Sequence, residues 1–136
     1  MRQVYDASAA LALLFREERG KLLEPVLDES FISSVNLSEA VAVMIRRGGD
    51  ATIIRESVDT LKLTVLPLSG SLAIDAGLLW PATKFAGSSL GDRCALVLSR
   101  QLGGTLLTTD RRLAEVAPQV GVVAELLVTP GAGSAR

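Results

Sequence analysis

The chain has 136 residues, 14 of them basic and 15 acidic, with a formal net charge of −1, no histidine and a single cysteine, Cys94. This length fits one ordinary domain, and the balanced charge argues against a protein that coats nucleic acid through many Lys and Arg contacts to phosphate. Without histidine or a second cysteine, the chain cannot build a Ser-His-Asp or Cys-His nucleophile, a His-ligated zinc site or an intrachain disulfide, so carboxylates must carry any chemistry.

Short apolar segments alternate along the chain with longer segments whose apolar residues recur at helical spacing. The pattern predicts strands over residues 4–5, 31–33, 63–66, 105–108 and 120–124. It predicts helices over residues 8–15, 20–27, 36–47, 51–61, 71–79, 90–102 and 110–116. Glycine pairs end the third and sixth of these helices, and Pro81 disrupts the fifth. Residues 129–136, rich in Gly, Ala and Ser, are expected to form a disordered tail.

This alternation predicts one α/β domain over residues 1–128, with a parallel sheet covered by helices on both faces. Right-handed crossovers place the strand-to-helix turns at one edge of such a sheet, where ligands of open α/β folds bind. The opening residues are interpreted as a strand of the mature fold, and no apolar run approaches the roughly 18–20 residues of a membrane span. We therefore expect a cytoplasmic protein without a membrane segment.

Four acidic residues are expected at helix starts near this edge of the sheet. Asp6 follows the first strand directly, and Asp110 follows the strand over residues 105–108. Glu39 and Asp92 are expected in the first turns of the helices that begin near residues 36 and 89. Taken singly, each acid has a simpler explanation as part of a helix cap, because residues 36–39 and 89–92 both have capping-box spacing.

Taken together, the four carboxylates predict a cation site. Two carboxylates about 4 Å apart repel by roughly 4 kcal/mol at an effective dielectric near 20, so a cluster needs a cation or raised pKa values. An all-oxygen ligand set suits Mg²⁺ or Mn²⁺, which can activate water for hydrolysis of a phosphodiester. Ser8 and Thr108 add hydroxyls near this edge, where they either orient ligands and water or satisfy nearby backbone groups.

These motifs resemble those of the PIN-domain family, especially the VapC ribonuclease toxins of type II toxin–antitoxin systems. The resemblance extends to about Leu127 and is carried by four segments in the family's order: residues 4–9 (VYDASA), 36–39 (NLSE), 87–93 (GSSLGDR) and 108–113 (TTDRRL). It implies a three-layer α/β/α fold with a central parallel sheet of four to five strands. It also implies Mg²⁺- or Mn²⁺-dependent endoribonuclease activity, a homodimer and a cognate VapB-like antitoxin.

The resemblance also assigns roles to single residues. Asp6, Asp92 and Asp110 match metal-binding acids, and Glu39 completes the catalytic set. Ser8 and Thr108 match polar neighbours of the family's site. Some members carry a further acid one turn beyond the last aspartate, where this chain has Leu113 and Ala114. A second ion would therefore need substrate phosphate to complete its coordination shell.

Other functions remain open from the sequence. Haloacid-dehalogenase-type phosphatases need an aspartate two positions after the first, where this chain has Ser8. Response-regulator receivers need a lysine after a late strand, but the only lysines are Lys21, Lys62 and Lys84. A third interpretation keeps the fold as a catalytically silent PIN-like binding module.

Two surface features also have more than one interpretation. Arg93 and Arg111 adjoin Asp92 and Asp110, and they either contact RNA phosphate or belong to ordinary solvated helix starts. The mean hydropathy of +0.38 is high, and exposed apolar area often marks a partner surface. We expect the early helices, around residues 10–27 and 41–54, to offer a groove to an antitoxin helix; the alternative is a core rich in Leu and Ala.

Overall fold

The sheet at the centre of the molecule has five parallel strands, as the alternation of the sequence predicts. The computed structural model describes residues 1–21 and 23–128, so the predicted disordered tail over residues 129–136 lies outside the described residues. The strand order is β3-β2-β1-β4-β5, with β1 in the middle, paired with both β2 and β4. The strands are β1 (Gln3–Tyr5), β2 (Ser30–Ser33), β3 (Thr64–Leu66), β4 (Thr105–Thr108) and β5 (Val123–Leu126).

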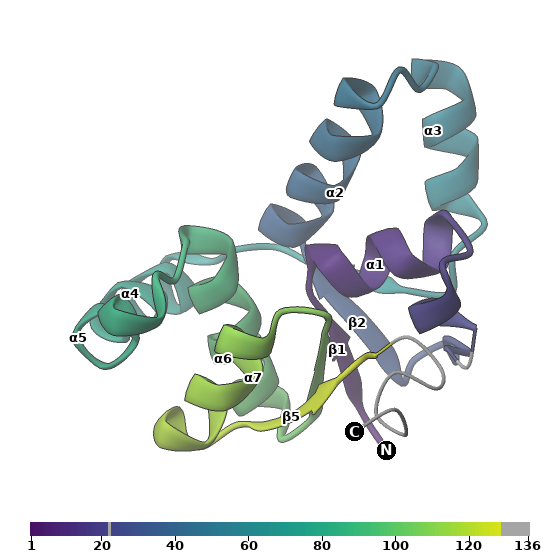
Figure 1. Ribbon diagram of the computed structural model, residues 1–136. Helices are drawn as coiled ribbons and strands as arrows, with labels where there is room; N and C mark the ends of the chain where they lie inside the picture. The colour runs from purple at the N-terminus through teal and green to yellow at the C-terminus, as the bar shows by residue number, and fades with distance from the viewer. Residues whose placement is uncertain (22, 129–136) are drawn as a thin grey trace.

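Helices cover both faces of this sheet and give the three-layer arrangement that Figure 1 shows. One face is covered by α1 (Ala7–Leu14), α2 (Ser34–Arg46) and α3 (Ala51–Asp59). The other is covered by α4 (Gly70–Leu78), α6 (Leu90–Leu102) and α7 (Arg111–Val116). The remaining helical segments are short: η1 (Glu18–Gly20), α5 (Trp80–Thr83), η2 (Lys84–Ala86) and η3 (Ala117–Val120).

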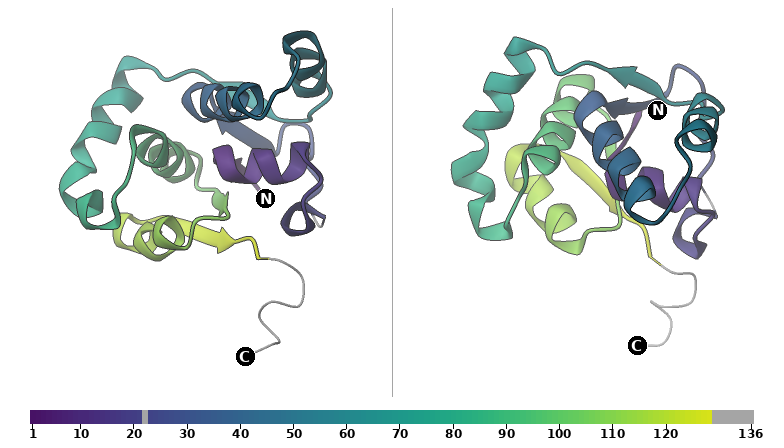
Figure 2. Two further views of the ribbon diagram at one scale, coloured as in Figure 1. Left: turned by 45° about the horizontal axis from the view of Figure 1, so that its top comes forward. Right: turned by 90° about the horizontal axis from the view of Figure 1, so that it is seen from above.

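Neighbouring residues of the central strands pack into different cores, because successive side chains of a strand point to opposite faces. Val4 and Leu106 are register partners and pack among the side chains of α4, α6 and α7. The next pair, Tyr5 and Leu107, packs among those of α1, α2 and α3. Figure 2 shows the two helical layers from further directions. Burial on both sides explains why adjacent residues at the centre of these strands are both apolar.

The fold brings four helix starts to one edge of the sheet. Helices α1, α2 and α7 begin directly after the carboxyl ends of β1, β2 and β4. Helix α6 runs back to the start of β4, and Gly103 ends it in the left-handed conformation, at φ 62°. The amino terminus of α6 therefore lies at the same edge as the ends of the strands. This edge is where the sequence predicts the acidic residues to lie.

Several predicted boundaries were wrong for identifiable reasons. The helix predicted over residues 20–27 does not form in the described part of that range, where η1 ends at Gly20 and Pro25 lacks the amide that a helix interior needs. Pro81 occupies the first turn of α5, so it starts a short helix rather than only disrupting one. The last strand begins at Val123 rather than at residue 120, because residues before it form η3 and Gly121 turns the chain at φ 78°.

Tyr5 carries a fully buried hydroxyl for which the described residues provide no hydrogen-bond partner. Burial raises the pKa of this phenol to about 12. A buried hydroxyl without a hydrogen-bond partner destabilises the folded state, because it has lost its bonds to water. We therefore expect Tyr5→Phe to keep or increase the free energy of unfolding, by up to about 1 kcal/mol. Urea denaturation checks this, and a loss of stability would show that the hydroxyl has a partner such as an internal water.

No helix in residues 1–21 or 23–128 is long and apolar enough to pass through a membrane.

Candidate active site

Asp6 is the most buried of the four predicted acids, with 5% of its surface exposed. It caps α1, where its Oδ1 accepts a hydrogen bond from the backbone N of Ala9 at 2.8 Å. The Ser8 hydroxyl donates to Oδ1 at 2.6 Å, and the Thr108 hydroxyl donates to Oδ2 at 2.5 Å. Both carboxylate oxygens are therefore held, and the predicted neighbours Ser8 and Thr108 contact the acid directly.

Thr108 connects this aspartate to the next predicted acid. Its hydroxyl oxygen accepts from the backbone N of Asp110 at 3.0 Å while its hydrogen goes to Asp6. Across the same gap, the Ser8 hydroxyl oxygen accepts from the backbone N of Thr109 at 2.9 Å. These bonds join the end of β1 to the end of β4. They fix the spacing between the helix start that carries Asp6 and the one that carries Asp110.

Asp92 and Asp110 both take part in helix caps, as the simpler interpretation of the sequence expects. Ser89 and Asp92 form a reciprocal capping box at the start of α6, in which Asp92 Oδ2 accepts from the backbone N of Ser89 at 3.0 Å. Asp110 caps α7 by accepting from the backbone N of Arg112 at 2.9 Å. Asp110 is exposed and Asp92 is half-buried. Their carboxylates thus lie at the rim of the edge, whereas Asp6 lies beneath them.

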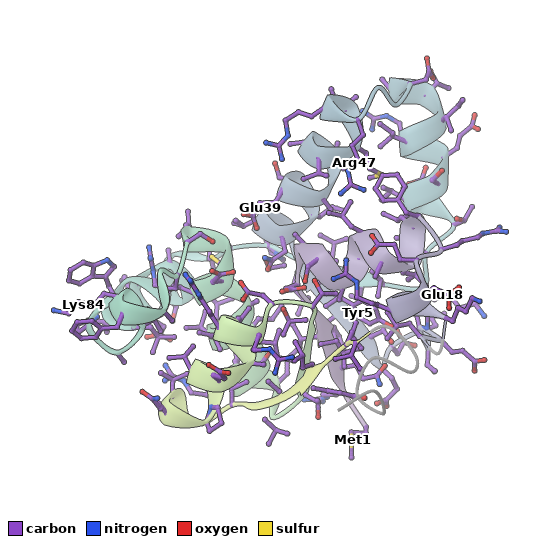
Figure 3. The ribbon with its side chains drawn as sticks, in the orientation of Figure 1. Met1, Tyr5, Glu18, Glu39, Arg47 and Lys84 are labelled. Atoms are coloured by element: carbon purple, nitrogen blue, oxygen red, sulfur yellow. The ribbon has the colours of Figure 1, made fainter. Side chains whose placement is uncertain are left out.

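Glu39 reaches the site from a different position than the sequence predicted. Helix α2 begins at Ser34 with Ser33 as its cap, two residues earlier than expected, so Glu39 is not in the first turn and residues 36–39 form no capping box. Its Oε1 accepts from Nδ2 of Asn36 at 3.1 Å. The same Nδ2 donates to the carbonyl of Gly91 at 3.1 Å, immediately before Asp92. Figure 3 labels Glu39 on the side of α2 nearest α6.

The four acids affect one another electrostatically. Burial raises the pKa of Asp6 to about 6, against the lowering effect of its hydrogen bonds, and the charge of Asp92 raises it further. Burial first, and then the Asp92 charge, also raise the pKa of Glu39. Burial raises the pKa of Asp92, and the Asp110 charge adds to this, whereas Arg93 opposes it. Asp92 is thus the common neighbour of the other three.

A divalent cation fits the donor chemistry of this edge. The acids offer only oxygen, and their charges lack an ion-pair partner among residues 1–21 and 23–128. In that same part of the chain, however, no three acidic, Cys or His side chains converge closely enough to hold one ion jointly. The prediction that the four acids hold a cation therefore stays a prediction. One oxygen of each aspartate accepts a hydrogen bond from a backbone amide at the start of its own helix.

Comparison with known proteins decides which family these features represent. The sequence profile described as the PIN domain matches residues 4–118. The chain belongs to the PIN domain family. Its fold is also similar to the crystal structure of PAE2754 from Pyrobaculum aerophilum, with a TM-score of 0.62 and 18% sequence identity over 91% of this chain and 89% of that one. Among curated proteins, no sequence matches this PIN domain significantly.

Membership of the PIN family supports a hydrolase at a coarse level, because PIN domains are typically nucleases and generally use divalent metal ions. Two residues of this PIN domain were not singled out from the sequence: Asn36, interpreted only as a cap, and Gly91. Their signal was present but ambiguous. Asn36 lies three residues before Glu39, on the same helix face, and Gly91 directly precedes Asp92.

Proposed function

We propose that this chain is a divalent-metal-dependent endoribonuclease that hydrolyses RNA phosphodiesters at the acidic edge of its sheet. The observation that carries the proposal is the placement of four carboxylates on four helices at one edge of the sheet, where Asp92 interacts electrostatically with the other three. None of the four forms an ion pair with a residue of the described chain. Membership of the PIN family, whose domains are typically nucleases, supports a hydrolytic role for these carboxylates. Burial also raises the pKa of Asp6 to about 6, and carboxylates with shifted pKa values cluster at functional sites.

The residues divide the work by their position. Asp6, Asp92 and Asp110 would hold Mg²⁺ or Mn²⁺, and Asp92 and Asp110 could each offer the oxygen that their cap bonds do not use. When bound, the cation would activate water and stabilise charge on the scissile phosphodiester. The pKa of Glu39 is raised, and its carboxylate does not cap a helix. Glu39 is therefore the acid best suited to accept the proton of the attacking water. Ser8 and Thr108 hold the Asp6 carboxylate in place through both of its oxygens.

Removal of metal gives the direct test. We expect the purified protein to cleave an unstructured RNA in Mg²⁺ or Mn²⁺, to lose cleavage in EDTA and to recover it when the ion is restored in excess. Addition of Ca²⁺, a larger ion with looser coordination, should restore less. Cleavage that continues unchanged in EDTA would contradict the metal-dependent assignment and would point to a contaminating nuclease.

We further propose that the nuclease is the toxin of a toxin–antitoxin pair. An apolar groove of about 410 Å³ lies between α2, α3 and β3, within the region expected to receive an antitoxin helix. Residues 9–12 are buried in the core and do not line this groove. The groove is lined by Leu37, Val41, Ile45, Ala51, Ile54, Arg55, Val58, Asp59 and Val65.

Expression in a bacterial host tests the toxin role. The wild-type chain should arrest growth, whereas Asp92→Asn should not. Co-expression of its cognate antitoxin should restore growth, and Ile45→Glu, which puts a charge on an exposed wall of the groove, should weaken that rescue without affecting RNA cleavage. Unimpaired growth with active wild-type protein present would count against the toxin role.

A homodimer is the assembly we propose for the same protein. Large apolar side chains are exposed along α4, α5 and the segment leading into α6, a surface separate from the groove. Light scattering should give twice the monomer mass, and a glutamate in place of Phe85, which is 90% exposed, should shift the mass toward the monomer. A wild-type mass equal to one chain would contradict the proposal. The exposed side chains are Ile74, Leu78, Trp80, Phe85 and Leu90.

A further inference from the structure

Asn36 is a buried amide whose oxygen and both donor hydrogens are hydrogen-bonded. It is 1% exposed, and its Oδ1 accepts from the Ser33 hydroxyl at 2.6 Å. The Gly91 carbonyl fixes which way the amide faces, because a carbonyl can only accept a hydrogen bond and must therefore meet the nitrogen and not the oxygen. Nδ2 therefore points its two hydrogens at the Glu39 carboxylate and at the Gly91 carbonyl, both at 3.1 Å. One side chain thereby joins α2 to the start of α6.

Gly91 completes the surroundings of the same carboxylate. A Cβ built on Gly91 would lie no farther than 2.7 Å from any of the three atoms of the Glu39 carboxyl group. Real side chains do not approach so closely, so any residue other than glycine at this position would push Glu39 away. The carboxylate thus rests against bare backbone one residue before Asp92. Two features determine the position of the Glu39 carboxylate: the hydrogen bond from Asn36 on its own helix, and the space left by Gly91 on the facing helix.

We propose that Asn36 and Gly91 form a seat that positions the Glu39 carboxylate for catalysis, with Asn36 acting as a positioning residue. The proposal rests on the proposed nuclease function and deepens it. A purely structural role would need only the bond from Asn36 to the Gly91 carbonyl, which holds the helices together. The second donor hydrogen points at an acid that forms no ion pair with the described residues, and it stabilises one orientation of that acid.

Steady-state kinetics on single and double variants test the seat. We expect Asn36→Asp, which keeps the shape but removes both donor hydrogens, to lower kcat for RNA cleavage by roughly 10–100-fold with KM nearly unchanged. In a Glu39→Gln background the same change should have little further effect, because the two residues act as one unit. Gly91→Ala should behave similarly, and Glu39→Asp, one methylene shorter, should partly restore the activity of Gly91→Ala.

The chain provides a matched control and a signal independent of activity. Gly77 lies within α4 with open space where a Cβ would be, so Gly77→Ala should leave cleavage unchanged. Asn36 is the only asparagine in the chain, so its side-chain amide gives a single identifiable pair of NMR resonances among those of three glutamines. That pair should shift in Glu39→Gln and in Gly91→Ala and should stay in place in Gly77→Ala.

Two outcomes would overturn the seat. The first is an equal fall in cleavage from Asn36→Asp in the wild-type and Glu39→Gln backgrounds, which would show that Asn36 acts independently of Glu39. The second is unaltered kcat in folded Gly91→Ala, which remains informative if the Asn36 variant does not fold. If Asp92→Asn also cleaves normally, the failure belongs to the proposed nuclease function and not to the seat.

Discussion

Asp92→Asn is expected to lower metal-dependent RNA cleavage at least a hundredfold while leaving the protein folded. Asp92 is the common neighbour through which Asp6, Glu39 and Asp110 are coupled, so its charge contributes most to attracting a cation. A catalytic metal stabilises the transition state by several kcal/mol, and each 1.36 kcal/mol changes the rate tenfold. Asparagine keeps the shape and can still accept the capping bond from Ser89, so the α6 terminus should persist.

Single-turnover cleavage of a labelled RNA, with circular dichroism on the same sample, measures both parts of this expectation. Asp59→Asn is a suitable control, because Asp59 is an exposed acid at the end of α3 that belongs to no part of the acidic edge. Its cleavage rate should match the wild type. Full activity of folded Asp92→Asn would show that catalysis does not take place at the acidic edge.

Asp6→Asn should make the protein more stable at neutral pH, although it too should reduce cleavage. Burial raises the pKa of Asp6 from 3.8 to about 6, so its ionisation at pH 7 costs the folded state about 3 kcal/mol relative to the unfolded chain. Asparagine carries no charge to bury and is as good a helix cap as aspartate. We expect a net gain in the free energy of unfolding of roughly 1–3 kcal/mol at pH 7. The weaker hydrogen bonds from Ser8 and Thr108 to a neutral amide offset part of the gain.

The pH dependence of that gain follows from the direction of the pKa change. Between about pH 4 and pH 6 the folded protein binds the Asp6 proton more tightly than the unfolded chain does, so wild-type stability falls as the pH rises through this window. Above pH 6 the loss is complete, and below pH 4 it disappears. Urea titrations at pH 4, 5, 6 and 7.5 should therefore show the advantage of Asp6→Asn growing with pH. An Asp6→Asn protein that is less stable than wild type at pH 7.5 would refute the argument.

Much of the fold could be predicted because its signals are local. Residues 90–102 have helical spacing, a polar cap and a terminal glycine, and α6 has those bounds in the structure. The strand over residues 105–108, which has two leucines between two threonines, also has its predicted bounds. The crossover rule then located the acids at one edge. Boundaries failed where a different residue capped the helix: Ser33 caps α2, so the helix begins at Ser34 and not at Asn36.

The candidate site residues could be selected from the sequence, but their geometry could not be predicted from it. Sequence spacing cannot tell whether a carboxylate at a helix start faces its own amides or a shared ion, since both arrangements use the same residue in the same place. The structure shows the first for Asp6, Asp92 and Asp110. Asn36 was missed for the same kind of reason. Its contact with Gly91 joins residues 55 positions apart, and no local pattern announces such a pair.

The capping bonds of the three aspartates have a consequence for how the chain folds. Many metal sites are assembled by their ion and unfold without it, but here one oxygen of each aspartate already accepts a hydrogen bond from a backbone amide. We therefore expect the chain to reach its folded state before any ion binds, so that folding and ion binding are separate events.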